Sequence, residues 1–498
     1  MLAAGRAPRL WALAIAGASM LGGMASSSLH RQPQPAWDEM PPREARLSLK
    51  IERVYPPAPN RPTLSAICTI VRAERHLAGL IGQRIYFSAV VRRRSAVPER
   101  SELVAAMGLL ERVRPGAPDG SFERSLADQG INFELSRGRV IATELPATRY
   151  RRFCGWLAGR MTELLGAGLE RRPDLAALYR AMLLGRKREL SEAQRNLFLE
   201  AGAMHLFAVN GLHIGTVAIA LHALFGLIRC PRLAATLLVL AALWLDVDTT
   251  GDSPSALRAF LMVAAVEVAW VLRLPANPMA SLSTAALAVL LADPQDLFSA
   301  SFQMSYGVMT ALVALGMPLA SEWQERLAPH RLLPQVSWSR LQKIRAHAQN
   351  HLAGALGIGA AAAAVGAVTG VEFFNLFVPG GLAANLVLVP PALLVIVAGV
   401  CSLACGFAGA AGAGLFFNRA AGVLLCAMTA FARAVTALPG VYFAAHYRAA
   451  WIGPAALAAL LAACLAGYAG GWRRERCGFW PPFVVVAMAL LFGVRYGP

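Results

Sequence analysis

The stretch Leu382–Val400 reads LAANLVLVPPALLVIVAGV, nineteen residues without a charged side chain. Such a run is close to the roughly 20 apolar residues that an α-helix needs to cross the hydrocarbon core of a bilayer. Comparable runs recur from Ala201 onward, for example RLAATLLVLAALWL at Arg232–Leu245, and we count about ten of them. Residues 201–498 are therefore predicted to form a multi-helix membrane domain.

The composition of the whole chain supports this prediction. Of its 498 residues, 56% are hydrophobic and only 15% are charged, and the mean hydropathy is +0.50. Soluble domains have roughly 45–50% apolar and 25% charged residues. We expect a polytopic α-helical membrane protein.

The N-terminal segment has a pattern of its own. Residues 10–29 form an apolar run behind Arg6 and Arg9, which is typical both of a secretory signal peptide and of a single anchor helix. Both interpretations of residues 1–29 stay open, because the small residues at the end of the run do not decide whether it is cleaved.

A more polar region lies between this segment and the membrane domain. In residues 30–150, stretches such as RLSLKIE at Arg46–Glu52 alternate apolar and polar residues, which predicts strands and a β-rich outer domain. Residues 151–200 predict an amphipathic helical connector. Its last helix is expected to begin with a capping box, SEAQ at Ser191–Gln194.

The distribution of Lys and Arg predicts the orientation in the membrane. Residues 321–351 form a loop with more basic than acidic side chains, so we expect this loop in the cytoplasm. Counting spans places the basic residues at 229–232, 273 and 473–476 on the same side and the acidic stretch DVDTTGDS at 246–253 on the other. The outer domain and the connector are then extracytoplasmic.

The formal net charge of +18 has two sources. In the membrane domain, the positive-inside rule, by which cytoplasmic loops are rich in Lys and Arg, accounts for most of the positive charge. The same rule cannot account for arginines of the outer domain and connector. Basic residues that face outward are expected to bind an anionic partner such as DNA, lipid headgroups or an acidic polymer. The candidates are Arg92, Arg93, Arg94, Arg149, Arg151 and Arg152.

The eight cysteines suggest at most one bridge. Cys68 and Cys154 both lie in the extracytoplasmic part, where a disulfide would contribute on the order of 2–4 kcal/mol. Sequence separation does not fix the distance between them, so paired and free thiols both stay open. No CxxC pair is present, and we expect no metal site.

The stretch HLFAVNGLHIG at His205–Gly215 puts two histidines and an Asn-Gly pair inside an apolar run. Asn210 and Gly211 favour a turn, and backbone groups freed by a turn cannot face lipid. One interpretation is a broken helix that faces protein or water. The other is a continuous kinked helix whose histidines bond across the bundle.

Further polar side chains occur in the predicted spans. Arg258 lies about one turn after the helix-starting Pro254, and other spans contain Gln303, Ser305 and Asn385. Intramembrane polar groups usually face the bundle interior or a water-filled path, although singly they also join helices. Glu267 is a further intramembrane acid for which the sequence names no partner.

Four motifs, in this order and spacing, resemble the ComEC family, the inner-membrane DNA-uptake channels of naturally competent bacteria. The resemblance covers roughly residues 180–440, and its most specific element is His-Leu-x-Ala-Val-x-Gly-Leu-His. The motifs are GRKRELSEAQRNLFLEAGAMHLFAVNGLHIG (185–215), PSALRAFLM (254–262), DPQDLFSASFQMSYGVM (293–309) and LAANLVLVP (382–390).

The resemblance implies a fold and a function. The outer domain would be an OB-like domain, and the membrane domain would conduct single-stranded DNA into the cytoplasm during natural transformation. It also implies that the protein lies in the inner membrane and has an outer DNA receptor and a cytoplasmic ATPase or helicase as partners. The oligomeric state stays open, and a homo-oligomer is possible. The residues implied to line the channel or form its signature are His205, Asn210, Gly211, His213, Arg258, Gln303, Ser305 and Asn385.

This sequence departs from the family pattern in two respects. Asn210 stands where the family usually has Ser. The chain ends at Pro498 without the His-x-His-x-Asp-His cluster of the family's lactamase-like domain, so we expect no dinuclear metal site, no cofactor and no nuclease activity, with a separate nuclease as partner. There is no GxxxxGK[ST] motif, and we expect no ATP hydrolysis and no enzyme activity.

Two other function classes stay open. An intramembrane metal-dependent hydrolase would use His205, His213 and Glu267 as ligands, although HExxH is missing. A small-molecule or lipid exporter would be expected to show inverted repeats, and we see no clear repeat.

Overall fold

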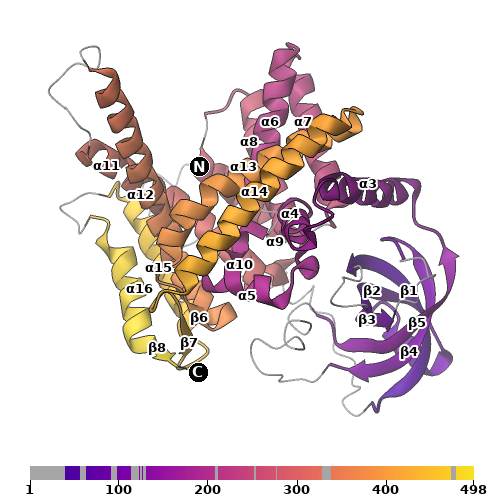
Figure 1. Ribbon diagram of the computed structural model, residues 1–498. Helices are drawn as coiled ribbons and strands as arrows, with labels where there is room; N and C mark the ends of the chain where they lie inside the picture. The colour runs from indigo at the N-terminus through magenta and orange to yellow at the C-terminus, as the bar shows by residue number, and fades with distance from the viewer. Residues whose placement is uncertain are drawn as a thin grey trace, which may run out of the picture. The chain divides into compact units, whose positions relative to one another are not determined.

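The computed structural model divides the chain into two compact units, which are described separately (Figure 1). The first comprises Met1–Pro57, Pro62–Thr148 and Thr284–Ser299, and the second comprises Ala58–Arg61, Arg149–Ser283 and Ala300–Pro498. The structure describes residues 40–55, 63–90, 98–113, 123, 126, 130–207, 211–251, 254–275, 277–327, 338–472 and 478–497. The predictions made for residues 1–29, for Arg92, Arg93 and Arg94, and for Asn210 lie outside these ranges.

The first unit contains a closed barrel with the strand order β1-β2-β3-β5-β4. Strands β3 and β5 pair in parallel, and the other neighbours are antiparallel. A five-stranded closed barrel is the architecture of the OB-fold, so the predicted β-rich domain is present. The strands are β1 (Arg43–Tyr55), β2 (Thr63–Ala73), β3 (Arg84–Val90), β4 (Leu103–Arg112) and β5 (Phe133–Leu145), with the short 3-10 helix η1 (Arg75–Leu80) after β2.

The barrel core follows from the alternation seen in the sequence. Leu47, Leu49 and Ile51 of β1 all point inward and are buried. Phe87 and Phe133 are buried in the same core, so these aromatic side chains are packing residues and do not form a surface for stacking bases.

Cys68 and Cys154 are both buried free thiols. They lie in different units, so a bridge between them stays one of the two alternatives that the sequence left open. Cys68 lies in β2 between the inward-facing Ala66 and Ile70, among hydrocarbon side chains of the barrel core. Burial, with a smaller contribution from the Glu52 carboxylate, raises the pKa of the Cys68 thiol. A neutral thiol in such a place packs as a small apolar side chain.

The second unit is helical, with a small three-stranded sheet in the order β6-β7-β8. In chain order its helices are α3 (Arg149–Gly166), α4 (Pro173–Leu184), η2 (Lys187–Glu189), α5 (Glu192–Glu200), η3 (Met204–Phe207), α6 (Gly211–Leu227), α7 (Arg232–Thr249), α8 (Pro254–Val271), α9 (Pro278–Ala292), α10 (Ala300–Ala311), the π-helical turn η5 (Leu312–Gly316), α11 (Met317–Leu327), α12 (Arg340–Phe374), α13 (Gly381–Phe407), α14 (Ala411–Thr436), α15 (Ile452–Ala469) and α16 (Trp480–Gly493). The strands are β6 (Leu376–Phe377), β7 (Phe443–Tyr447) and β8 (Val494–Tyr496); α9 runs into the first unit, which also holds η4 (Pro294–Phe298).

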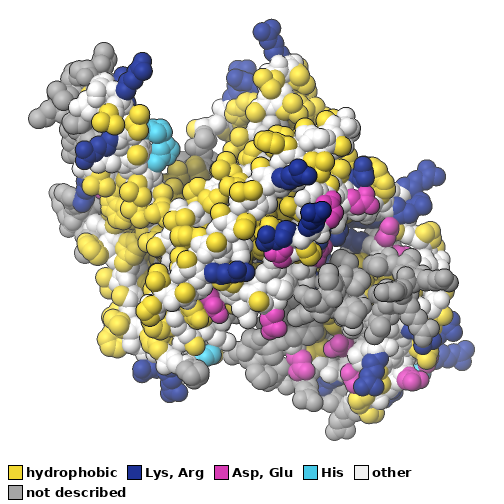
Figure 2. All heavy atoms as spheres, viewed as in Figure 1, with side chains coloured by type: hydrophobic (Ala, Val, Ile, Leu, Met, Phe, Trp, Pro, Cys, Tyr) yellow, Lys and Arg dark blue, Asp and Glu magenta, His cyan; other side chains and the backbone are white. Residues whose placement is uncertain are grey.

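Six helical stretches within the described residues are long and apolar enough to cross a membrane. They are Pro254–Val271, Ala300–Leu327, Arg340–Phe374, Gly381–Phe407, Ala411–Thr436 and Ile452–Ala469, and three shorter apolar helices are His213–Leu227, Pro278–Ala292 and Trp480–Phe492. Figure 2 shows hydrophobic side chains spread over the outer surface of α13 and α14, as expected for helices that contact lipid. The helical membrane class is confirmed, whereas about ten spans stays a prediction.

The connector packs into the helical unit. Its helices α3, α4 and α5 share one buried core with α13 and α14, in which Tyr179 and Phe198 are fully enclosed. The Asn418 side chain of α14 donates hydrogen bonds to the carbonyl oxygens of Leu164 (2.8 Å) and Ala167 (2.9 Å) at the end of α3. The connector therefore forms part of the bundle and is more than a linker.

The predicted capping box at the start of α5 is confirmed. Ser191 Oγ accepts a hydrogen bond from the Gln194 backbone N–H at 3.1 Å, and Gln194 Oε1 accepts one from the Ser191 N–H at 3.0 Å. Two otherwise unpaired helix-start donors are satisfied in this way.

Candidate functional site: polar contacts inside the helical unit

The stretch that contains the two histidines does not form one continuous helix. Helix α5 ends at Glu200, residues 204–207 form the 3-10 helix η3, and α6 starts at Gly211. The continuous kinked helix is therefore wrong for the described residues 201–207. The helix restarts next to the Asn-Gly pair, as the broken-helix interpretation predicts.

Gly202 connects this interrupted stretch to α13. Its φ of +68° is a left-handed conformation that favours glycine, and a Cβ there would lie 3.2 Å from the Gly381 Cα. The Asn385 Nδ2 of α13 donates a hydrogen bond to the Gly202 carbonyl at 3.2 Å, and the His205 side chain hydrogen-bonds the Gly202 backbone. Two of the sequence-predicted residues, His205 and Asn385, thus meet at one peptide group. Sequence reasoning missed Gly202, although a glycine just after a helix is a known C-cap signal.

Arg258 of α8 is 1% exposed and is among the largest fully buried side chains among the described residues. Its Nη2 donates to the Ser301 carbonyl at 2.8 Å and to the Ser301 Oγ at 2.6 Å, which connects α8 to α10. A buried guanidinium needs such polar contacts because unpaired charge in an apolar interior is strongly unfavourable. Gln303 and Ser305 lie further along α10 and are half-buried.

His213 lies in the first turns of α6, near the exposed Gly211. It is buried, and its Nε2 is 3.8 Å from Oδ2 of Asp246 in α7. Counting spans placed the acidic stretch 246–253 outside, and its residues 246–249 form the end of α7. Asp246 therefore faces His213 from within a helix, an arrangement that sequence composition could not reveal.

The basic residues of α3 fall into two groups. Arg151 Nη1 binds Asp248 Oδ1 at 2.7 Å, and the Tyr150 hydroxyl donates to Asp248 Oδ2 at 2.7 Å. The Asp248 side chain is only 3% exposed, so Arg151 serves a buried ion pair. Arg149 and Arg152 are exposed and stay candidates for anion binding.

The residues proposed as metal ligands are not brought together. His213 faces Asp246, whereas the Glu267 carboxylate is 2.7 Å from Nε2 of His222. Within the part of the chain that the structure describes, no three His, Cys, Asp or Glu side chains are grouped closely enough to hold a metal ion. This geometry gives no support to the hydrolase hypothesis.

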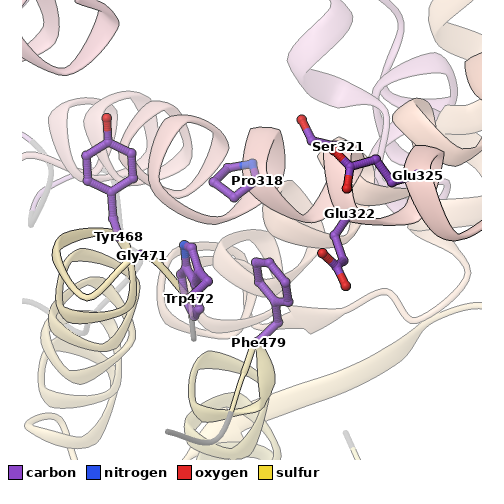
Figure 3. Close-up of a pocket in the computed structure, with 8 residues that line it drawn as sticks. All are labelled: Pro318, Ser321, Glu322, Glu325, Tyr468, Gly471, Trp472 and Phe479. Atoms are coloured by element: carbon purple, nitrogen blue, oxygen red, sulfur yellow. The ribbon is translucent and has the colours of Figure 1, made fainter. Parts of the chain in front are cut away.

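A cavity of about 310 Å³ lies apart from these contacts (Figure 3). It is formed by α11, the end of α15 and the start of α16, and the rings of Trp472 and Phe479 stack in its wall at 4.9 Å. Glu322 and Glu325 of α11 lie opposite these rings. None of the predicted channel residues lines this cavity.

A family model described as Competence protein matches residues 182–470. The chain belongs to the competence protein family. ComE operon protein 3 of Bacillus subtilis (strain 168) is similar to this chain, with 28% identity over 141 residues; the aligned part is 28% of this chain and 18% of that protein. No solved structure matches the chain. The residues matched by the family model include both polar contacts described above, that of Asn385 with Gly202 and that of Arg258 with Ser301.

Proposed function

We propose that this protein conducts single-stranded DNA inward across the bacterial inner membrane during natural transformation. One observation carries the proposal. The residues that match the competence family model, 182–470, include apolar helices, an interrupted helix and a buried arginine.

The physics of DNA transport requires such features. Each nucleotide carries a negative charge, and an unhydrated charge in hydrocarbon is prohibitively unfavourable, so the path must be polar and wet. Non-helical backbone at membrane depth is tolerated only where it is buried in protein or lines water. The interrupted stretch at Gly202–His205 has this character, and we propose that His205, Asn210, Gly211 and His213 border the path. Arg258, Gln303, Ser305 and Asn385 would complete its lining.

The barrel would receive the strand outside the membrane. OB barrels bind single strands through basic grooves and aromatic platforms, usually on the β2–β3 face. Here Ile67 and Tyr86 on that face are buried against Leu126 and Ile131, so this part of the face is covered by the chain itself. We therefore propose electrostatic, sequence-independent binding whose affinity falls steeply with salt. Its residues would be Arg92, Arg93, Arg94, Arg149 and Arg152.

Other proteins would supply the energy and the strand. The sequence has no P-loop, so we propose that a cytoplasmic ATPase or helicase pulls the strand and that a separate nuclease removes its complement. An outer receptor would deliver the DNA. Residues 321–351 were predicted to be a loop, but they include the end of α11 and the start of α12. This segment is our proposed docking site for the motor, because it is long and basic.

The test measures uptake of labelled DNA into the cytoplasm of cells that lack the chain and carry wild type or a variant. Asn385→Leu removes the contact with Gly202, and His213→Leu removes a buried polar group near the break. Both are expected to reduce uptake at least tenfold at unchanged membrane levels. His446→Leu, on an exposed position of β7, is the control and should leave uptake unchanged. If cells without the chain take up DNA as well as wild type, the proposal is wrong.

A further inference from the structure

Three helices meet at a buried acid that the proposed conduit does not use. The Glu267 carboxylate of α8 has a side-chain exposure of 10% and lies 2.7 Å, through Oε1, from Nε2 of His222 in α6. Its second oxygen, Oε2, accepts a hydrogen bond at 3.1 Å from the hydroxyl of Thr236 in α7. Both carboxylate oxygens are thus occupied, each by a different helix.

The position of this group along the helices is well defined. Glu267 lies four residues before the end of α8 at Val271, and Thr236 lies four residues after the start of α7 at Arg232. At 1.5 Å per residue, the carboxylate is about 6 Å inside these helix ends. These ends carry Arg229, Arg232 and Arg273, the side predicted to face the cytoplasm. His222 keeps a side-chain exposure of 28%, so its ring is not fully enclosed by protein.

A basic side chain lies near the pair. The Arg232 guanidinium lies 5.3 Å from the ring centre of Trp270, and the His222 ring meets the same tryptophan edge-on at 5.6 Å. Arg232 therefore lies near the pair and offsets a negative charge on it. The other titratable or charged side chains on packed elements are Asp246 and Asp248 on α7, His213 on α6, Arg258 on α8, Tyr306 on α10, Cys401 and Cys405 on α13, and Arg149, Tyr150, Arg151, Arg152, Cys154, Arg160 and Glu163 on α3.

An apolar layer separates this pair from the other acid–histidine contact of the same helices. Ala218 of α6 and Val239 and Leu243 of α7 belong to one buried cluster, which lies between Glu267 and the His213–Asp246 contact. The His222–Glu267 pair is therefore a local site and not one member of a continuous polar chain.

We propose that His222 and Glu267 form a reversible proton-binding site within the membrane. In one state a neutral imidazole donates its Nε2–H to the carboxylate, and Arg232 offsets the single negative charge. In the other state one proton from water has been added, which gives imidazolium with carboxylate or imidazole with carboxylic acid. Thr236 serves both states, because its hydroxyl donates to a carboxylate and accepts from a carboxylic acid.

The chemistry of the site favours this function over a purely structural one. An ionisable residue inside the membrane is costly, and neutral small residues join helices at lower cost. Histidine is the side chain whose charge changes most readily near neutral pH, and here it is in direct hydrogen-bond contact with an acid. The proposal does not depend on DNA conduction, and its test needs no DNA.

The experiment is pH-difference infrared spectroscopy of the purified full chain in lipid bilayers. Wild type should show carboxyl or imidazole bands from uptake of one proton. These bands should be lost in Glu267→Gln, changed in His222→Gln, and retained with a shift in Glu267→Asp. Thr236→Val is the matched control, because it removes the interhelical hydrogen bond and keeps the acid–histidine pair.

The outcomes separate the proposal from a structural role. Loss of the bands in Glu267→Gln, with retention in Thr236→Val, supports the proton site. Identical difference spectra for wild type and Glu267→Gln overturn it. Size-exclusion chromatography checks the fold, and if Glu267→Gln aggregates, unchanged spectra in His222→Gln overturn the proposal in the same way.

Discussion

Removing the Arg151 guanidinium should loosen α3 from α7 without weakening DNA binding. Arg151 and Tyr150 each bind Asp248 at 2.7 Å, and the Asp248 side chain is 3% exposed. Arg151→Gln leaves the buried Asp248 carboxylate with its neutral partner Tyr150 but without its cationic partner. Breaking a buried ion pair in this way costs about 3–5 kcal/mol. Because Tyr150 stays, we expect the lower end, about 3 kcal/mol, or on the order of 100-fold in the opening equilibrium of α3.

The assay is hydrogen exchange of the α3 backbone amides in the detergent-solubilised full chain. Asp248→Asn should cost less than Arg151→Gln, because it removes the charge that needs a partner. The double variant should then recover part of the loss, with a coupling energy of about 1–3 kcal/mol. Arg152→Gln, at the exposed neighbouring position, should leave exchange unchanged.

For DNA binding, we expect Arg152→Gln to have the larger effect and Arg151→Gln the smaller one. Arg152→Gln should reduce the salt dependence of single-strand binding by about one counterion, whereas Arg151→Gln should not. The reasoning is refuted if Arg151→Gln leaves the exchange of α3 within twofold of wild type, or if it weakens DNA binding as much as Arg152→Gln does.

Two further predictions concern packing and pH. Gly357→Ala should lower the free energy of unfolding by about 1–3 kcal/mol, because its Cβ would lie 2.6 Å from the Ala320 backbone nitrogen, and thermal unfolding should show a lower midpoint. Gly366→Ala, where nothing lies within 4 Å, should not lower it. Burial, and then the Glu111 carboxylate, raise the pKa of Glu134, so the folded barrel binds that proton more tightly and loses stability as pH rises through this window. Glu134→Gln should therefore raise the free energy of opening of β4 and β5, measured by hydrogen exchange, by about 0.2–1 kcal/mol at neutral pH and have no effect in acid.

Local patterns were sufficient to predict much of the fold. The apolar runs predicted the membrane helices, the period-two alternation around Leu47–Ile51 predicted the barrel strands, and the SEAQ motif predicted a capping box that is present at Ser191. These features depend on residues within one or two turns of each other, so the sequence contains all the information they need.

The contacts of the candidate site depend on helix packing and could not be predicted. Sequence analysis named no partner for Glu267, because His222 is 45 residues away and only the packing of α6 on α8 brings them together. Arg151 was expected to bind DNA because its charge is conspicuous in the sequence. Its partner Asp248 lies 97 residues further along the chain, and only the packing of α3 on α7 brings the two together.

The polar groups of the helical unit share a pattern that bears on conduction. Asn385 with Gly202, and Arg258 with Ser301, each join two elements that are distant in sequence. A residue that holds two helices together and also faces a conduit has two roles, so its removal disturbs packing and lining at once. The proposed conduction would require water or phosphate to replace such contacts. Each exchanged hydrogen bond changes the free energy by about 0.5–1.5 kcal/mol for a neutral pair and by about 1.5–3 kcal/mol for a charged group such as Arg258. Polar contacts can therefore exchange for water at low cost, whereas the apolar contacts around them cannot, and this difference favours the polar contacts as the place where a path for DNA opens.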